Sequence, residues 1–326
     1  GMQQEAMEAW DASGVHCVFV NAGEESNDVT TILKRLAHRT YCGELMRPAL
    51  TCASNPADIE AARHDGRHCY YRVTNGVPLP RACQSVPEGL SLVRVFAQLG
   101  ARMMHLTYNR ANTIGAGCAE THDAGLTDFG QAAIAEMNRV GVIPDVAHSG
   151  QKTGLEAARC SARPVVASHT TCAALAEHIR AKGDDVLRAI ADSGGVIGVV
   201  MFQAFLKGSY DLAAVLDQVG HVVKTVGIDH VAIGSDTPHM VRAPASDPPA
   251  LRSPRQRQPW RAFWPADAFT LPAGLPPEAA SSLSWTNFPF ITVGLVSRGF
   301  TDSDIRKIMG GNILRVARQT WEQRDA

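Results

Sequence analysis

The stretches GVIPDVAHSG (141–150) and RPVVASHT (163–170) each join a short apolar run to a histidine. Short apolar runs bounded by turn residues are typical of buried strands. We therefore predict that His148 and His169 emerge at the carboxyl ends of two strands. That edge of the sheet is where (β/α)8 barrels build their active sites.

A third apolar run, DHVAIGSD (229–236), ends in Asp236 in the same way. A catalytic zinc needs three protein ligands and an open position, and two histidines with one aspartate meet that count. Asp236 lies two strands away from His169 in the expected order, so a water or a substrate oxygen would have to complete the set. A metal-free alternative uses one histidine as a general base. The residues are thus consistent with one zinc ion at most or with no cofactor.

Apolar runs alternate with helical patterns along the chain, which indicates parallel strands joined by right-handed crossovers. We therefore expect an α/β fold, a (β/α)8 TIM-type barrel. Seven strands are predicted with a weaker eighth, at 14–21, 68–75, 101–109, 141–149, 163–169, 194–202 and 229–236, with the weaker run at 48–53. Either the weaker run joins the sheet, or a first strand that should precede Gln3 is absent and the barrel is incomplete. A partner subunit could cover the resulting gap, so we expect a homodimer.

Residues 238–285 interrupt the alternation of strands and helices with a segment rich in proline, arginine and tryptophan. The segment follows the strand that ends in Asp236, so we expect a long loop on the catalytic face of one domain that spans 1–326. Disordered segments are poor in aromatic residues. Trp260, Phe263 and Trp264 therefore favour an ordered lid or a dimer contact.

Composition narrows the function classes. The 326 residues include 31 Lys and Arg against 32 Asp and Glu, so no basic field indicates a nucleic-acid or membrane partner. The eight cysteines are scattered singly, which favours reduced thiols in a cytoplasmic protein. No apolar stretch approaches the roughly 20 residues of a membrane span. We expect a small molecule as the partner.

Five phrases resemble the membrane (renal) dipeptidase family, which are metallo-dipeptidases among the amidohydrolase-type barrels. They occur in order along the chain, at 125–150, 164–171, 184–199, 227–236 and 308–316. The resemblance implies two zinc ions bridged by a glutamate, and a hydroxide that attacks a dipeptide. It also implies that His148 and His169 hold the second metal ion and that Arg180 binds the substrate carboxylate. Asp236 would lie beside the scissile bond and the substrate amine.

Several positions depart from the family pattern. The chain begins too late, or too differently, to contain the His-x-Asp pair of the first strand. Thr74, followed by Asn75, stands where the family has its bridging glutamate, and a hydroxyl cannot replace a carboxylate between two dications. Tyr108 stands where a substrate-contacting histidine is usual. These residues therefore do not support a two-zinc mechanism.

Other polar residues are weaker candidates. The loop 114–128 gathers Cys118, Glu120, His122 and Asp123, a run that more often belongs to a solvated loop than to a site. His105 falls within a strand, and we expect it to be a structural histidine away from the strand tips.

Two functions remain open. The first is a dipeptidase-like hydrolase of a dipeptide or small amide that bears a free carboxylate, with at most a mononuclear metal site. The second is a metal-free or catalytically altered homologue that binds or transforms a small carboxylated metabolite. The retained Arg180, His148, His169 and Asp236 favour the first, whereas Thr74 and the missing His-x-Asp pair favour the second.

Overall fold

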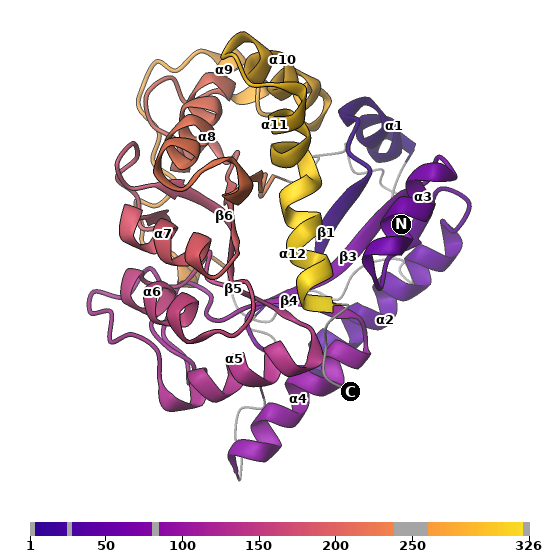
Figure 1. Ribbon diagram of the computed structural model, residues 1–326, viewed down its shortest axis with the longest axis vertical. Helices are drawn as coiled ribbons and strands as arrows, with labels where there is room; N and C mark the ends of the chain where they lie inside the picture. Colours follow the sequence, from indigo (N-terminus) through magenta and orange to yellow (C-terminus); the bar gives the residue numbers. More distant parts are fainter. Residues whose placement is uncertain (1–3, 25–27, 80–84, 238–259, 322–326) are drawn as a thin grey trace.

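A computed structural model describes residues 4–24, 28–79, 85–237 and 260–321. Its strands all pair in parallel with their neighbours. The strands are β1 (Cys17–Glu24), β2 (Leu50–Cys52), β3 (His68–Asn75), β4 (Ala101–His105), β5 (Ile143–Asp145), β6 (Val166–Cys172), β7 (Ala181–Lys182), β8 (Val196–Val199) and β9 (Val231–Ile233). Helices lie outside the curved sheet, as Figure 1 shows for α4 to α8. This arrangement confirms the predicted α/β fold with a TIM-type barrel.

The helices begin where the sequence supplies side-chain caps. Asn55, Thr127 and Asp211 accept bonds from the backbone N–H groups of the first helical turn, which would otherwise lack partners. The helices are α1 (Gln4–Ser13), α2 (Val29–Leu45), α3 (Pro56–His64), α4 (Val86–Gln98), α5 (Asp128–Val140), α6 (Gln151–Cys160), α7 (Asp184–Asp192), α8 (Leu212–Val226), α9 (Pro277–Ser281), α10 (Pro289–Ser297), α11 (Asp302–Arg306) and α12 (Asn312–Trp321).

The sheet runs in the order β1-β3-β4-β5-β6-β8-β9, and within the described residues β1 and β9 do not pair. The weak run at 48–53 does join the sheet as β2, but it pairs only with the start of β3 and does not close the ring. The prediction of an incomplete barrel is therefore confirmed for the part of the chain that the structure describes.

The gap between β1 and β9 is covered by the chain itself. Trp10 of α1 is buried and lies 6.4 Å from the ring of Trp285, in the short helix η5 (Trp285–Asn287). The indole N–H of Trp285 donates to the carbonyl of Thr237, just beyond β9, and that of Trp10 donates to Val15, just before β1. Two indole rings thus connect residues beside the two edge strands within one chain.

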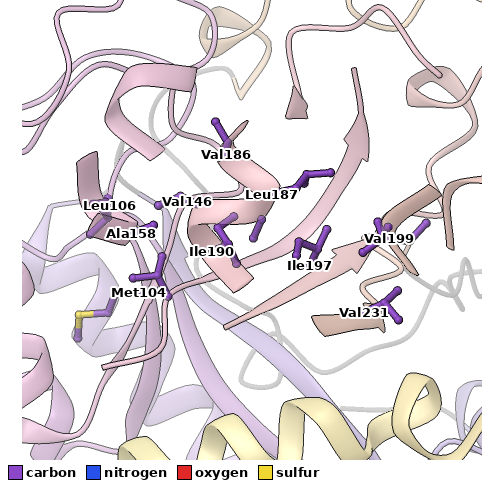
Figure 2. Close-up of a cluster of buried hydrophobic side chains, with 14 of the residues drawn as sticks. Met104, Leu106, Val146, Ala158, Val186, Leu187, Ile190, Ile197, Val199 and Val231 are labelled. Atoms are coloured by element: carbon purple, nitrogen blue, oxygen red, sulfur yellow. The ribbon is translucent and has the colours of Figure 1, made fainter. Parts of the chain in front are cut away.

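Two apolar clusters cover the two faces of the curved sheet. The outer cluster joins strand residues such as Met104, Ile197 and Val231 to the surrounding helices (Figure 2). The inner cluster joins the alternate residues of the strands to α12, which lies across the amino-terminal ends of the strands and contributes Val316, Ala317 and Trp321. Because successive side chains of a strand point to opposite faces, the inner cluster identifies which strand residues face the lumen.

An irregularity in β6 places His169. Ala167 pairs with Ile197 of β8 but Thr170 pairs with Val199, so β6 has one extra residue between these pairs. The extra length brings the Ser168 carbonyl against Gly198 and Gly234, where a Cβ atom would lie within 2 Å of that oxygen. The sequence context suggested that His169 lies at the end of its strand. It lies within β6 instead, because the irregular strand continues to Cys172.

Among the described residues, no helix is both long enough and apolar enough to cross a membrane. Residues 238–259 of the predicted catalytic-face loop, and the side chain of Trp260, lie outside the described part of the structure.

Candidate functional site

The first layer of the site consists of His105 and Asp145. Met103 and Ile143 belong to the inner cluster, so His105 and Asp145, two residues further along their strands, also face the lumen. They are register partners in the β4–β5 ladder, and His105 Nε2 lies 2.7 Å from Asp145 Oδ2. The expectation that His105 stands away from the site is therefore wrong, because the strand's period of two directs it inward.

Asp145 is fully buried and strongly held. Its Oδ1 accepts hydrogen bonds from the backbone N–H groups of Ala147 and Ser168, at 2.9 and 3.0 Å. Burial opposes ionisation of this carboxyl, but the nearby His105 and His169 and the bond from Ser168 outweigh it and hold its pKa well below the usual range. Asp145 is thus a carboxylate at neutral pH.

His148 and His169 meet above this layer. The ring nitrogen Nδ1 of His148 lies 2.7 Å from the amide oxygen of Asn109, so this nitrogen carries the proton and Nε2 keeps a lone pair. The Nε2 atoms of the two histidines are 3.1 Å apart. Burial lowers the pKa of both imidazoles well below its usual value, and Arg180 adds to the lowering. The pair therefore presents neutral nitrogen ligands toward one point.

These residues fit one metal ion better than two. Ligand atoms of His105, Asp145 and His169 all lie within 4.8 Å of one another. Two nitrogens that each bind zinc at about 2.0–2.1 Å in a tetrahedral site lie about 3.3 Å apart, close to the separation of the His148 and His169 nitrogens. Thr74 is buried at the end of β3, and its hydroxyl has no partner among the described residues. Nitrogen and carboxylate ligands for a single ion are present, whereas neither Thr74 nor Asn75 supplies a carboxylate at the end of β3.

Thr74 and Asn75 lie on opposite faces of β3. Val73 belongs to the inner cluster, and the register partner of Thr74 on β4 is Met104, which belongs to the outer cluster. The alternation of the strand therefore places Asn75, and not Thr74, on the lumen face. Of these two predicted substrate-binding residues, Asn75 is the one on the lumen face.

Arg180 is completely buried immediately before β7. Its Nε donates to the carbonyl of Ala147 at 3.0 Å, and its Nη2 donates to that of His169 at 2.8 Å. Nη1 has no hydrogen-bond partner among the described residues. A buried guanidinium with an unused donor beside three histidines is a candidate anion-binding group.

Asp236 and Tyr108 complete the predicted set. Asp236 has a left-handed backbone with φ of 52°, and its Oδ2 lies 3.8 Å from His169 Nε2 with 39% of the side chain exposed. Left-handed backbone at a residue other than glycine is uncommon and recurs at functional sites. The Tyr108 ring lies 4.3 Å from the His148 ring and covers it.

The loop 114–128 supports the fold around the site. Asp123 accepts hydrogen bonds from the backbone N–H of Lys152 and the hydroxyl of Thr153. It thereby caps the first turn of α6, although it lies far from that helix in the sequence. Glu120 accepts from the backbone N–H of Ala111, and the thiol of Cys118 donates to Asn109. These contacts are structural.

Sequence reasoning missed Lys182 as well as Asp145. Lys182 is fully buried on β7, two residues from Arg180, and its ammonium donates to the carbonyl of Ser149. Burial lowers its pKa to about 8. Lys182 gives little signal in the sequence, because it lies on a strand of two residues outside the main ring, with no apolar run beside it.

Residues 264–269 form an aromatic segment, called here the roof, that covers the site. Trp264 is 6% exposed, and its ring lies 6.0 Å from that of His148 and stacks on Phe205 at 5.6 Å. The segment is anchored at Ala268, whose carbonyl lies 3.0 Å from His178 Nε2. His178 Nδ1 accepts the backbone N–H of Arg180, so this imidazole must be neutral to make both bonds.

We expect the anchor at His178 to weaken in mild acid. Burial lowers the pKa of His178 to about 4, against about 6.5 in the unfolded chain. The unfolded state therefore binds more protons between these values, and stability is lost as the pH falls from about 6.5 toward 4. The advantage of the wild type over His178→Asn in free energy of unfolding should shrink by about 1–2 kcal/mol between pH 7 and pH 5. Denaturant unfolding at both pH values measures it, and an unchanged difference contradicts the tautomer assignment.

Comparisons with known proteins agree with this geometry. A family model described as membrane dipeptidase (peptidase family M19) matches residues 4–246. An uncharacterized dipeptidase of Schizosaccharomyces pombe is 34% identical over 159 residues, which are 46% of this chain and only 38% of that relative's length.

Two solved structures share the fold over nearly the whole chain. An amidohydrolase from Pseudomonas aeruginosa is 27% identical with a TM-score of 0.79, covering 99% of this chain and 94% of its own. The probable dipeptidase PvdM from the same organism is 21% identical with a TM-score of 0.75, covering 99% and 90%. The fold is therefore shared with both structures.

Proposed function

Because the chain belongs to the membrane dipeptidase family, peptidase family M19, we propose that it hydrolyses a dipeptide or a small amide bearing a free carboxylate. The observation that carries this proposal is the unused Nη1 of Arg180, buried beside His148 and His169. A buried charged donor without a partner is costly, and a substrate carboxylate would supply the missing acceptor. The proposed site is therefore a carboxylate clamp beside a histidine cluster.

We propose at most one metal ion, with zinc as the candidate. Either His148 and His169 would hold it through Nε2, with an open position completed by water or substrate, or His169 would hold it together with His105 and Asp145. Bound zinc supplies an activated water and polarises the carbonyl of the scissile bond. Ser168 lies 2.7 Å from Nδ1 of His169 and Asn109 holds Nδ1 of His148, so both rings are already oriented for binding.

The remaining predicted residues would position the substrate. Asp236, half exposed at the edge of the cluster, would accept hydrogen bonds from the substrate amine. Tyr108 would cover one side of the scissile bond, because its ring already covers His148. Asn75 would contact the substrate from the lumen face at the end of β3, where the family has its bridging carboxylate. Thr74 would support this strand end from the opposite face.

A metal-free homologue that binds or transforms a carboxylated metabolite is the second candidate. The direct contact between His105 and Asp145 favours it, because a carboxylate that orients an imidazole is also the arrangement of a general base. Under this alternative Arg180 would keep its role and the histidines would need no ion.

A dipeptide assay with and without chelator separates the two functions. The hydrolase proposal predicts turnover of free dipeptides, loss of turnover after removal of metal by a chelator, and recovery with zinc. C-terminally amidated dipeptides should be poor substrates. Turnover that survives thorough chelation favours the metal-free alternative, and the absence of turnover for every dipeptide with zinc present contradicts the hydrolase.

We also propose a cytoplasmic homodimer in which the 238–285 segment takes part. The cysteines within the described residues are all unpaired thiols, which supports a reducing compartment. Light scattering during size exclusion should give twice the chain mass of 34.9 kDa. A mass of one chain contradicts the dimer.

A further inference from the structure

We propose that Trp264 restricts the size of the substrate residue that carries the carboxylate, so that substrates ending in glycine or alanine are preferred over those ending in a large residue. This preference rests on the proposed carboxylate-binding role of Arg180. The argument follows from where the unused donor of Arg180 lies and from what surrounds it.

The guanidinium of Arg180 lies beside two aromatic rings that stack on each other. Its central carbon is 5.6 Å from the ring centre of Phe205 and 5.8 Å from that of Trp264. The other two nitrogens donate to the carbonyls of Ala147 and His169. A carboxylate that binds the remaining Nη1 therefore brings its own α-carbon next to these rings.

Trp264 also leaves little room for a substrate side chain next to His148 and Tyr108. Its ring meets His148 edge-on at 6.0 Å and Tyr108 edge-on at 6.5 Å. One side chain thus borders both the carboxylate clamp and the histidines where the scissile bond would lie. A large side chain on the carboxylate-bearing residue would have to displace the indole, whereas hydrogen or a methyl group would not.

The indole is held too firmly to yield easily. Trp264 stacks on Phe205, packs against Phe269 at 4.8 Å and belongs to a buried aromatic cluster on the short helix η1 (Gln203–Phe205). Packed interiors resist displacement of large groups. Trp264 therefore resists displacement, and the cost of displacing it rises with the size of the substrate side chain.

Binding and hydrolysis of Gly-Ala and Gly-Phe by the wild type and Trp264→Ala test the proposal. The wild type should favour Gly-Ala by at least about tenfold, since a few methylenes in a confined apolar site change selectivity by that much or more. Trp264→Ala should reduce this preference by about tenfold, chiefly by improving Gly-Phe. Equal use of both dipeptides by the wild type, or an unchanged ratio in the variant, overturns the proposal.

Phe202→Ala is the matched control. Phe202 packs on Phe205 and Phe269 in the same cluster, at 4.7 and 5.6 Å, so its loss removes a similar ring while the contacts of Trp264 with His148 and Tyr108 stay in place. It should keep the wild-type ratio. Calorimetric binding separates this proposal from the hydrolase: a size-dependent affinity without turnover upholds the role of Trp264 while the proposed hydrolysis fails, and no binding of either dipeptide overturns the role of Trp264.

Discussion

Replacing Arg180 by lysine should lower kcat/KM for a free dipeptide by about 10²–10³, or roughly 3–4 kcal/mol. Lysine keeps the positive charge but loses the planar fork that serves two carbonyls and leaves Nη1 for a carboxylate. Steady-state kinetics on a free dipeptide and on its amidated counterpart measure the effect. The slow reaction of the amidated dipeptide should change much less, because it has no carboxylate to bind.

Arg188→Lys is the control for this substitution. Arg188 lies exposed on α7, 3.9 Å from Asp184, and should leave both rates unchanged. If Arg180→Lys slows the free and the amidated dipeptide equally, then Arg180 maintains the position of His169 and does not bind the carboxylate. Equal rates for both dipeptides in the wild type lead to the same conclusion.

Gly234→Ala should destabilise the protein by more than about 4 kcal/mol. The added Cβ would lie 1.7 Å from the carbonyl oxygen of Ser168 and 3.1 Å from the Cα of His169. Backbone atoms of β6 would have to move, and His169 would move with them. Denaturant unfolding gives the loss of stability, and whatever protein remains folded should show little hydrolysis.

Gly220→Ala is the matched control on α8. An added Cβ there meets nothing within 4 Å, and alanine in a helix is favoured over glycine by roughly 0.5–1 kcal/mol. It should leave stability unchanged or slightly higher. A Gly234→Ala protein as stable as the Gly220→Ala protein would contradict the close contact between β6 and the residues after β9.

The sequence carried enough information to predict the fold. Apolar runs of strand length, separated by helical patterns, predicted the order of parallel strands, and each of the seven firm predictions corresponds to a strand of the observed order. What the sequence did not reveal was how the gap is filled. Trp10 and Trp285 are 275 residues apart (285 − 10), and a contact between such distant aromatic residues has no local signal.

The site was only partly predictable. His148 and His169 lie 3.1 Å apart, and Arg180 donates to the His169 carbonyl, so three of the candidate residues do converge. His105 was overlooked although a signal existed: in ARMMH the period of two places Met103 and His105 on one face. Asp145, in the run IPDV, could be recognised only through its register with His105.

The zinc stoichiometry of hydrolysis tests the central claim most directly. Zinc should be titrated into metal-free protein while the turnover of Gly-Ala is followed, with His148→Ala/His169→Ala as the comparison. We predict that activity rises to a plateau at one zinc per chain and that the double variant neither binds the ion nor hydrolyses the dipeptide. A plateau at two zinc ions per chain, or turnover that does not depend on metal, would contradict a hydrolase with a single-metal site.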